Sequence, residues 1–274
     1  MDFDYVTDVV VVGSGSAALT TALAAKESGL EAIVLESTEL VGGSSAMSGG
    51  GAWIPNNPLM HEAGVPDSYE DARKYLDRVV GDVGPASSPE RRDAFLRRGP
   101  EMVTWLRGLG FRFMYGRGYS DYYPELPGGT PIGRGVEGQT FDLRALGPWA
   151  DRIRIASPLP LHTPEAAKFA LSMRTVDGFL TAAKVIGLRT VGNRLLGRRP
   201  VASGGTLIGQ LLRLLIERSV TVWLRSPMIE LITDSDGVVG VVVDHDGRTV
   251  RVGARRGVML AAGGFARNIE MREQ

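Results

Sequence analysis

The sequence predicts an α/β fold: a Rossmann-like nucleotide-binding domain with a parallel sheet plus a β-hairpin or meander, and an inserted, mostly helical portion. A β-branched run at 8–12, an Ala/Leu-rich stretch at 16–28 and a second apolar run at 32–35 predict strand, helix and strand. This order is typical of a βαβ unit. Apolar runs at 238–243 and 248–253, separated by an Asp-Gly turn, predict the hairpin.

The middle of the chain has a different character. Helical patterns cover 68–82 and 88–109, and Ser-Pro-Glu at the start of the second is a typical helix N-terminus. A further helix is expected over 164–188, with a break near Thr175 to Gly178. We therefore predict a discontinuous nucleotide-binding domain, 1–60 and 200–274, into which 61–199 is inserted as part of a substrate or cap domain.

Composition narrows the class of protein. Lys plus Arg and Asp plus Glu both number 31, so the net charge is zero, and a nucleic-acid groove or polybasic membrane patch is not expected. The chain has no cysteine, so we expect neither a disulfide nor a thiolate metal site, and we predict no metal centre. The acidic N-terminus lacks the pattern of a signal peptide, and no apolar run approaches the roughly 20 residues of a membrane span. These features favour a cytoplasmic protein that acts on a small molecule.

A glycine fingerprint of the form G-x-G-x-x-A follows the first strand directly. Gly13 permits a tight turn, Gly15 lets the backbone approach a pyrophosphate, and Ala18 is small enough for close packing of helix on strand. Ser16 and Ala17 begin the helix, where free N–H groups and the helix dipole favour phosphate. The fingerprint predicts a dinucleotide site.

An acidic residue ends the second strand, and it indicates which dinucleotide the site binds. Glu36 can accept hydrogen bonds from ribose hydroxyls, with Ser37 beside it, and an acid here disfavours the 2′-phosphate of NADP. A second glycine-rich segment follows, and its backbone amides and hydroxyls suit a flat polar ring system. This segment favours FAD over NAD. The candidate FAD-binding residues in it are Gly42, Gly43, Ser44, Ser45, Met47, Ser48, Gly49, Gly50 and Gly51.

The chain resembles the flavoproteins grouped with fumarate reductase and succinate dehydrogenase, and within them the 3-ketosteroid Δ1-dehydrogenases. The resemblance rests on VVVVGSGSAALTTALAAKESGLEAIVLE, GGSSAMSGGGAWIPNN, YSDYYPELPGG and VVGVVVDHDGRTVRVGARRGVMLAAGGF. The first and last are general to the superfamily, whereas the middle two, with Trp53, Pro55 and Asn56, are similar to the steroid branch.

This resemblance implies noncovalent FAD, because Ser44 and Ser45 stand where the succinate dehydrogenase branch has a flavin-linked His. It also implies a reaction: a base removes a proton from C2 of a 3-ketosteroid, and a hydride passes from C1 to flavin N5. In this family a Tyr forms part of the pair of groups that removes the proton. It matches Tyr122 here, with Tyr119 and Tyr123 as alternatives.

The resemblance places further cofactor contacts near the C-terminus of the chain. Met228 corresponds to a strand residue whose backbone contacts the adenine. Ala262 and Gly263 follow a predicted strand at 257–261, where the returning strand meets the cofactor. The resemblance does not identify the electron acceptor.

Members of this family continue for about as many residues again after the segment that matches Gly263 and Gly264. We therefore expect this chain to be a truncated N-terminal half that lacks part of the substrate domain. By itself it should be inactive and hold FAD weakly. Two alternatives remain: a fumarate reductase-type FAD oxidoreductase acting on a small unsaturated acid, or a non-catalytic FAD-binding fragment.

Overall fold

The computed structural model describes residues 2–157, 159–265 and 268–273. The chain divides into two compact units. The first comprises Met1–Ser48, Leu143–Ser157 and Gly204–Gln274, and the second comprises Gly49–Asp142 and Pro158–Ser203. These bounds differ from the expected insertion at 61–199, because the second unit starts earlier in the chain and residues 143–157 pack with the first unit.

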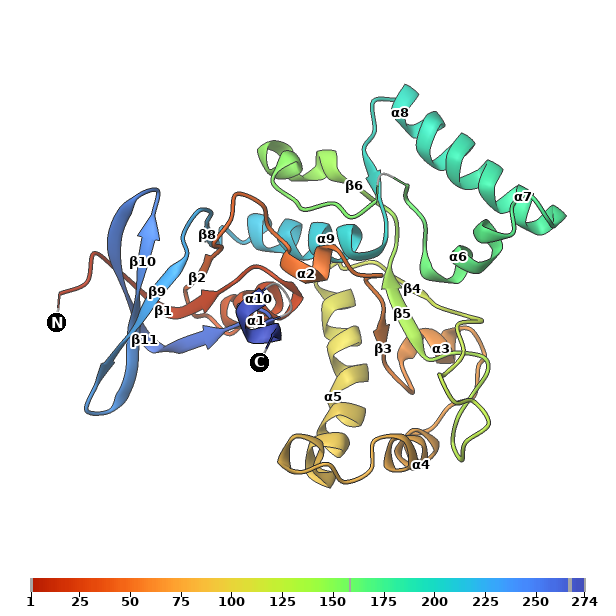
Figure 1. Cartoon of the computed structure of the whole chain (residues 1–274), viewed down its shortest axis with the longest axis horizontal. Helices are drawn as coiled ribbons and strands as arrows, with labels where there is room; N and C mark the ends of the chain where they lie inside the picture. The colour runs from red at the N-terminus through yellow and green to blue at the C-terminus, as the bar shows by residue number, and fades with distance from the viewer. Residues whose placement is uncertain (1, 158, 266–267, 274) are drawn as a thin grey trace. The chain divides into compact units, whose positions relative to one another are not determined.

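A six-stranded sheet in the order β8-β2-β1-β11-β10-β9 forms the centre of the first unit (Figure 1). Its strands are β1 (Tyr5–Val12), β2 (Ala32–Leu35), β8 (Thr221–Trp223), β9 (Met228–Asp234), β10 (Gly237–His245) and β11 (Arg248–Leu260). Its helices are α1 (Ser16–Glu27), α2 (Gly43–Ala46), α9 (Ser203–Glu217), α10 (Ile269–Arg272) and the 3₁₀ segment η2 (Leu143–Asp151). Strands β8, β2, β1 and β11 are parallel, and β11, β10 and β9 form an antiparallel meander, which confirms the predicted fold class.

The βαβ unit forms as predicted. Val9 to Val12 pair in register with Ala32 to Leu35, so β1 and β2 are parallel neighbours joined by α1. Val10 and Val11 are both fully buried, as expected for a strand covered on both faces. Helix α1 packs on these strands through small residues such as Ala18 and Ala22. Because small side chains allow close approach, the strand ends and the start of α1 meet at one place.

An apolar cluster on the sheet packs the meander against the parallel strands. It contains Val10, Val12, Ile33, Leu35, Val241, Val243, Val252 and Ala254. Fully burying one side chain of this size contributes about 1.5–3 kcal/mol. These residues alternate along β10 and β11 with the period of 2 that places every second side chain of a strand on one face. Asp246 and Gly247 turn it, with φ of 50° and 81°, as a type I′ turn requires.

The expectation of separate strands at 248–253 and 257–261 is wrong, because both belong to the single strand β11. Thr7 pairs with Ala254, and Val9 pairs with Gly257, so β11 carries one extra residue opposite β1. Gly257 has a φ of 149° at this bulge. A bulge absorbs the extra residue without ending the strand.

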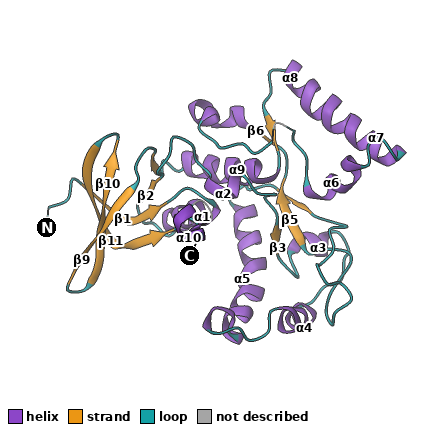
Figure 2. Cartoon of the chain, in the orientation of Figure 1, coloured by secondary structure: helices purple, strands orange, loops and turns teal. Residues whose placement is uncertain are grey.

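The second unit contains more helix than strand (Figure 2). Its helices are α3 (Pro58–Glu62), α4 (Tyr69–Val79), α5 (Pro89–Gly108), α6 (Thr163–Ala170), α7 (Val176–Ala182), α8 (Asn193–Leu195), the 3₁₀ turn η1 (Pro85–Ser87) and the π-helical η3 (Ala183–Gly192). Its strands are β3 (Ala52–Trp53), β4 (Phe113–Tyr115), β5 (Gly135–Gly138), β6 (Phe141–Asp142) and β7 (Pro200–Val201).

Helix starts in this unit follow the predicted capping chemistry. Ser88 Oγ accepts the N–H of Arg91 at the start of α5. The helix expected at 164–188 is interrupted where the sequence indicated a break, because Thr175 caps a new helix by accepting the N–H of Gly178 at 3.0 Å. Within the described residues, no helix has the length and apolar character that a membrane span requires.

Candidate cofactor site

Gly13 joins the C-terminal ends of β1 and β11. Its φ is 102°, and a Cβ placed on it would lie 2.3 Å from the carbonyl oxygen of Ala261. The N–H of Ala261 in turn donates to the carbonyl of Val12 at 2.8 Å. A side chain at position 13 would therefore push the two strand ends apart. The glycine is required by this close approach of backbone to backbone.

Helix α1 begins directly after this turn with its N–H groups largely free. Gly15 is the N-cap and supplies no side chain to satisfy them. Ser45 Oγ accepts the N–H of Ser16 at 3.1 Å. The N–H groups of Ala17 and Ala18, in the first turn, have no partner inside the helix. This end of α1 can bind the oxygens of a phosphate.

Glu36 lies at the end of β2 and is 6% exposed. Its Oε1 accepts the N–H and the hydroxyl of Thr38, each at 2.9 Å, and the hydroxyl of Ser37 at 3.3 Å. Its Oε2 accepts the hydroxyl of Ser14. A carboxylate oxygen accepts about two hydrogen bonds, so Oε2 retains capacity for one further donor such as a ribose hydroxyl.

Ser14 is a candidate site residue that the sequence analysis missed. Its hydroxyl donates to Glu36 and accepts the N–H of Gly42 at 2.9 Å. One side chain thus connects the fingerprint, the acid of β2 and the second glycine segment. The sequence signal that could have indicated Ser14 is its hydroxyl, which stands at the variable position of G-x-G.

The second glycine segment packs against the first turns of α1 and α9. Gly42 has a φ of 121°, and a Cβ there would lie 2.6 Å from that of Ala46. Ser45 holds the segment to α1, because its hydroxyl lies 3.1 Å from that of Ser16. On the other side, the N–H of Gly204 donates to the carbonyl of Ser48 at 3.0 Å. Candidates Gly43 and Ser44 begin the short helix α2, and Met47 follows it with its side chain 44% exposed.

The last three glycines of the segment belong to the second unit. A Cβ on Gly49 would lie 3.3 Å from Thr163 Oγ1, and one on Gly51 would lie 3.5 Å from Glu137 Cγ. Gly50 has a φ of 69°. This part of the segment is therefore packed tightly and is no loose linker.

The remaining cofactor candidates, near the C-terminus of the chain, belong to the first unit. Met228 starts β9, two residues after Ser226, whose N–H donates to the carbonyl of Glu36 at 2.8 Å. Ala262 and Gly263 follow the end of β11, beside Gly13. In open parallel sheets, ligands bind beyond the carboxyl ends of the strands. Within the first unit, the candidates other than Met228, which begins its strand, gather at that edge.

The candidate tyrosines lie together in one loop of the second unit. Tyr122 is 87% exposed, while Tyr119 and Tyr123 are 49% and 51% exposed. The N–H of Tyr123 donates to the hydroxyl of Tyr75 at 3.2 Å. Within the described residues, no hydrogen bond joins the Tyr122 hydroxyl to a side chain that could activate it.

A buried ion cluster anchors this tyrosine loop, and the sequence analysis missed it. Arg134 donates to Asp67 Oδ1 at 2.7 Å and to Asp121 Oδ2 at 2.8 Å. Asp121 also accepts the indole N–H of Trp53 at 2.7 Å. Because Asp121 precedes Tyr122, its inward side chain fixes the backbone from which Tyr122 points outward. Arg134 also donates to the carbonyl of Gly128 at 2.8 Å, which closes the loop.

These features fit a dinucleotide. The close approach at Gly13 leaves no room for a side chain, the start of α1 has no side-chain cap from its N-cap residue, and Glu36 is held by neighbouring hydroxyls with one acceptor position left. The three would hold a pyrophosphate and a ribose. The fold and the site together define a dinucleotide-binding protein.

A sequence model of the family described as "FAD binding domain" matches residues 8–274. The chain therefore belongs to this family, whose cofactor is FAD, and its relatives are FAD-dependent oxidoreductases. The 3-oxosteroid 1-dehydrogenase of Mycolicibacterium smegmatis is 39% identical over 278 residues, which cover 97% of this chain and 48% of that protein. The 4-oxocyclohex-2-ene-1-carboxylate 5-dehydrogenase of Sinomonas cyclohexanicum is 33% identical over 277 residues, which cover 97% and 46%.

Among solved structures, the chain is similar to 3-ketosteroid delta1-dehydrogenase from Sterolibacterium denitrificans in complex with 1,4-androstadiene-3,17-dione. The TM-score is 0.88 and the identity 34%, over 98% of this chain and 50% of that one. The chain spans about half the length of the curated relatives it matches.

Proposed function

We propose that this chain provides the FAD site of a dehydrogenase that forms a carbon–carbon double bond beside a ring ketone, with a 3-ketosteroid as substrate. The similarity to a 3-ketosteroid dehydrogenase, at 34% identity and a TM-score of 0.88, carries this proposal. The steroid and oxocyclohexene substrates for which these relatives are named share a six-membered ring that carries a ketone. The ring ketone is therefore the common chemistry.

The two units take different roles in this proposal. The first unit binds FAD: α1 holds the pyrophosphate, Glu36 the ribose, and the Met228 backbone the adenine. Gly42 to Ser48 line the flavin, with Ala262 and Gly263, and Gly49 to Gly51 of the second unit stay candidate flavin contacts. The second unit is part of the substrate or cap domain. When bound, FAD supplies the acceptor for a hydride from the substrate.

Tyr122 removes the proton from C2 of the substrate. An ordinary tyrosine has a pKa of about 10, so it needs a partner that stabilises its anion. Tyr122 is 87% exposed, so its hydroxyl is accessible to such a partner and to substrate. Tyr119 and Tyr123 are the alternatives in the same loop.

We also propose that the FAD is noncovalent and that the protein is cytoplasmic. Ser44 and Ser45 offer no imidazole for a flavin link, and His61 lies on α3 in the second unit. Precipitation with acid should release all flavin to the supernatant. Flavin that stays with the precipitate would contradict a noncovalent site.

Turnover of a 3-ketosteroid with a dye acceptor tests the reaction in the protein extended to the full length of its relatives. We expect 1,2-desaturation, and Tyr122→Phe should reduce kcat by about 10²–10⁴-fold without changing flavin content. Tyr119→Phe and Tyr123→Phe test the two alternatives, because the base would be reassigned if one of them lost turnover while Tyr122→Phe kept it. The substrate assignment would fail if the extended protein reduced fumarate and left the steroid unchanged.

A further inference from the structure

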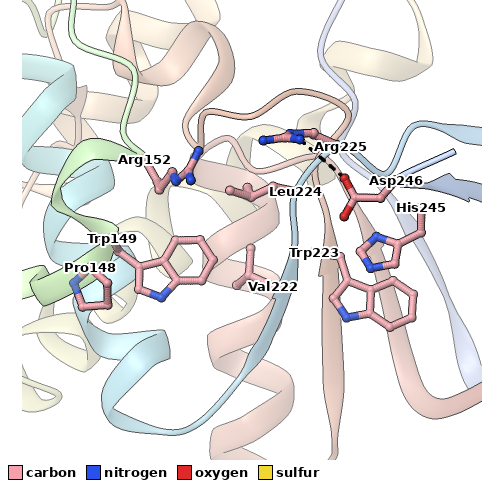
Figure 3. Close-up of a pocket in the computed structure, with 9 residues that line it drawn as sticks. All are labelled: Pro148, Trp149, Arg152, Val222, Trp223, Leu224, Arg225, His245 and Asp246. Atoms are coloured by element: carbon pink, nitrogen blue, oxygen red, sulfur yellow. Dashed lines mark ion pairs between the residues drawn. The ribbon is translucent and has the colours of Figure 1, made fainter.

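An open groove of about 440 Å³ follows the edge strand β8 in the first unit (Figure 3). Its lining includes two tryptophans, two arginines and two aliphatic side chains, which are Trp149, Trp223, Arg152, Arg225, Val222 and Leu224. We call it the β8 groove. None of these residues belongs to the fingerprint or to the second glycine segment.

Two indole rings give the groove aromatic walls. Trp149 comes from η2 and lies on the side of Val222 and Leu224, whereas Trp223 comes from β8 and lies on the other side of that strand (Figure 3). Trp223 is held in place, because it stacks on His245 with ring centroids 4.4 Å apart and an interplanar angle of 18°. His245 Nδ1 in turn lies 2.7 Å from Ser226 Oγ. Fixed aromatic walls favour a ligand with a ring.

The charges at the rim favour an anion. Arg152 and Arg225 line the same groove, and Asp246 contributes one carboxylate, 3.7 Å from Arg225. Arg152, Arg225 and Asp246 together sum to one positive charge. A single carboxylate neutralises that charge and matches the planar fork of a guanidinium.

Both walls are hydrogen-bonded through their backbones to the segment that connects Glu36 with Gly42. The N–H of Glu36 donates to the carbonyl of Trp223 at 2.8 Å, and the N–H of Arg225 donates to the carbonyl of Thr38 at 2.9 Å. On the η2 side, the N–H of Val41 donates to the carbonyl of Arg152 at 2.7 Å. The backbone of this segment therefore holds both walls of the groove in place.

We propose that the β8 groove binds a ring compound carrying one carboxylate, while FAD occupies its own site. The ring packs on the indole of Trp149 beside Val222 and Leu224, and the carboxylate pairs with Arg152 and Arg225. This binding requires no turnover, so its test is independent of the proposed reaction.

Calorimetric titration of the chain in saturating FAD tests this site, with 2-naphthoate as probe and neutral 2-naphthamide as its isostere. We expect naphthoate to bind at least about tenfold more tightly than the amide, because one charge-assisted pair is worth this much. The Arg152→Ala/Arg225→Ala variant should lose that preference. Trp149→Ala should weaken both ligands.

The double variant Arg255→Ala/Arg256→Ala is the control, since it also removes two exposed charges, from β11. It should bind naphthoate as the unmodified chain does. The proposal is overturned if the acid and the amide bind equally, if neither binds, if the groove variant keeps its preference, or if FAD displaces the probe.

Discussion

Arg134 Nη1 donates to Asp121 Oδ2 at 2.8 Å, and the two side chains are 1% and 0% exposed. With Asp67, they place two carboxylates and one guanidinium in the interior of the second unit. Such a cluster is stable only while each charge has its partner.

Replacing Arg134 with Met should therefore destabilise the second unit by about 3–5 kcal/mol, because two buried carboxylates lose their cation. Denaturant unfolding followed by tryptophan fluorescence measures this, since Trp53 donates to Asp121. Arg98→Met is the matched control. Its ion pair with Glu101 is exposed and should change stability by no more than about 1 kcal/mol. Equal effects of the two variants would contradict a structural role for the cluster.

Gly13→Ala should abolish flavin binding and destabilise the first unit. Its Cβ would meet the carbonyl oxygen of Ala261 at 2.3 Å, so β1 and β11 must separate where the pyrophosphate is expected. Gly29→Ala is the control, because Gly29 also has a positive φ, 77°, but nothing lies within 4 Å of its Cβ. That change should cost about 1–2 kcal/mol and leave flavin content intact. The absorbance of bound flavin per chain distinguishes the two variants.

Glu36→Gln should weaken FAD binding by about 10- to 100-fold, because a charge-assisted hydrogen bond to a ribose hydroxyl is lost. Equilibrium dialysis with FAD gives the affinity directly. Glu39→Gln, in the same loop and exposed, should bind FAD as before. Unchanged affinity in Glu36→Gln would remove Glu36 from the site.

Acid should loosen the packing of α6 on η3 through Glu165. Burial raises the pKa of Glu165, but two hydrogen bonds from Arg189, at 2.7 and 2.9 Å, outweigh it and leave a pKa of about 2, below the ordinary 4.5. Since the folded pKa is lowered, this stabilisation is complete above pH 4.5 and is lost as the pH falls toward about 2.

Glu165→Gln should remove this part of the pH dependence and cost at most about 1 kcal/mol at neutral pH, as the pair is partly accessible to solvent. Thermal unfolding between pH 6 and pH 2 compares the two proteins. Parallel pH curves would show that Glu165 does not titrate as described.

Much of the first unit could be predicted because its signals are local. The run at Val9 to Val12, the spacing of Gly13, Gly15 and Ala18, and the Asp246-Gly247 turn each lie within a few residues. The bulge at Gly257 could not be predicted. Whether an extra residue ends a strand or is accommodated in it as a bulge depends on the neighbouring strand, which is β1 here.

The candidate site shows the same division. The sequence predicted Glu36 and Gly42 as cofactor residues, but not the Ser14 hydroxyl that connects them. It also placed residues 143–157 in the insertion, whereas Val41 and Ile153 form a bridge that holds them to the first unit. Contacts between residues far apart in the chain leave no periodic signal.

The sequence by itself determined the FAD-binding βαβ unit, since strand, turn and helix propensities act over neighbouring residues. The tertiary structure decided which side chains share a site: Ser14 with Glu36 and Gly42, and Arg134 with Asp67 and Asp121. Hydrogen bonds and ion pairs form only within a few ångströms, and folding alone brings such distant residues within that range.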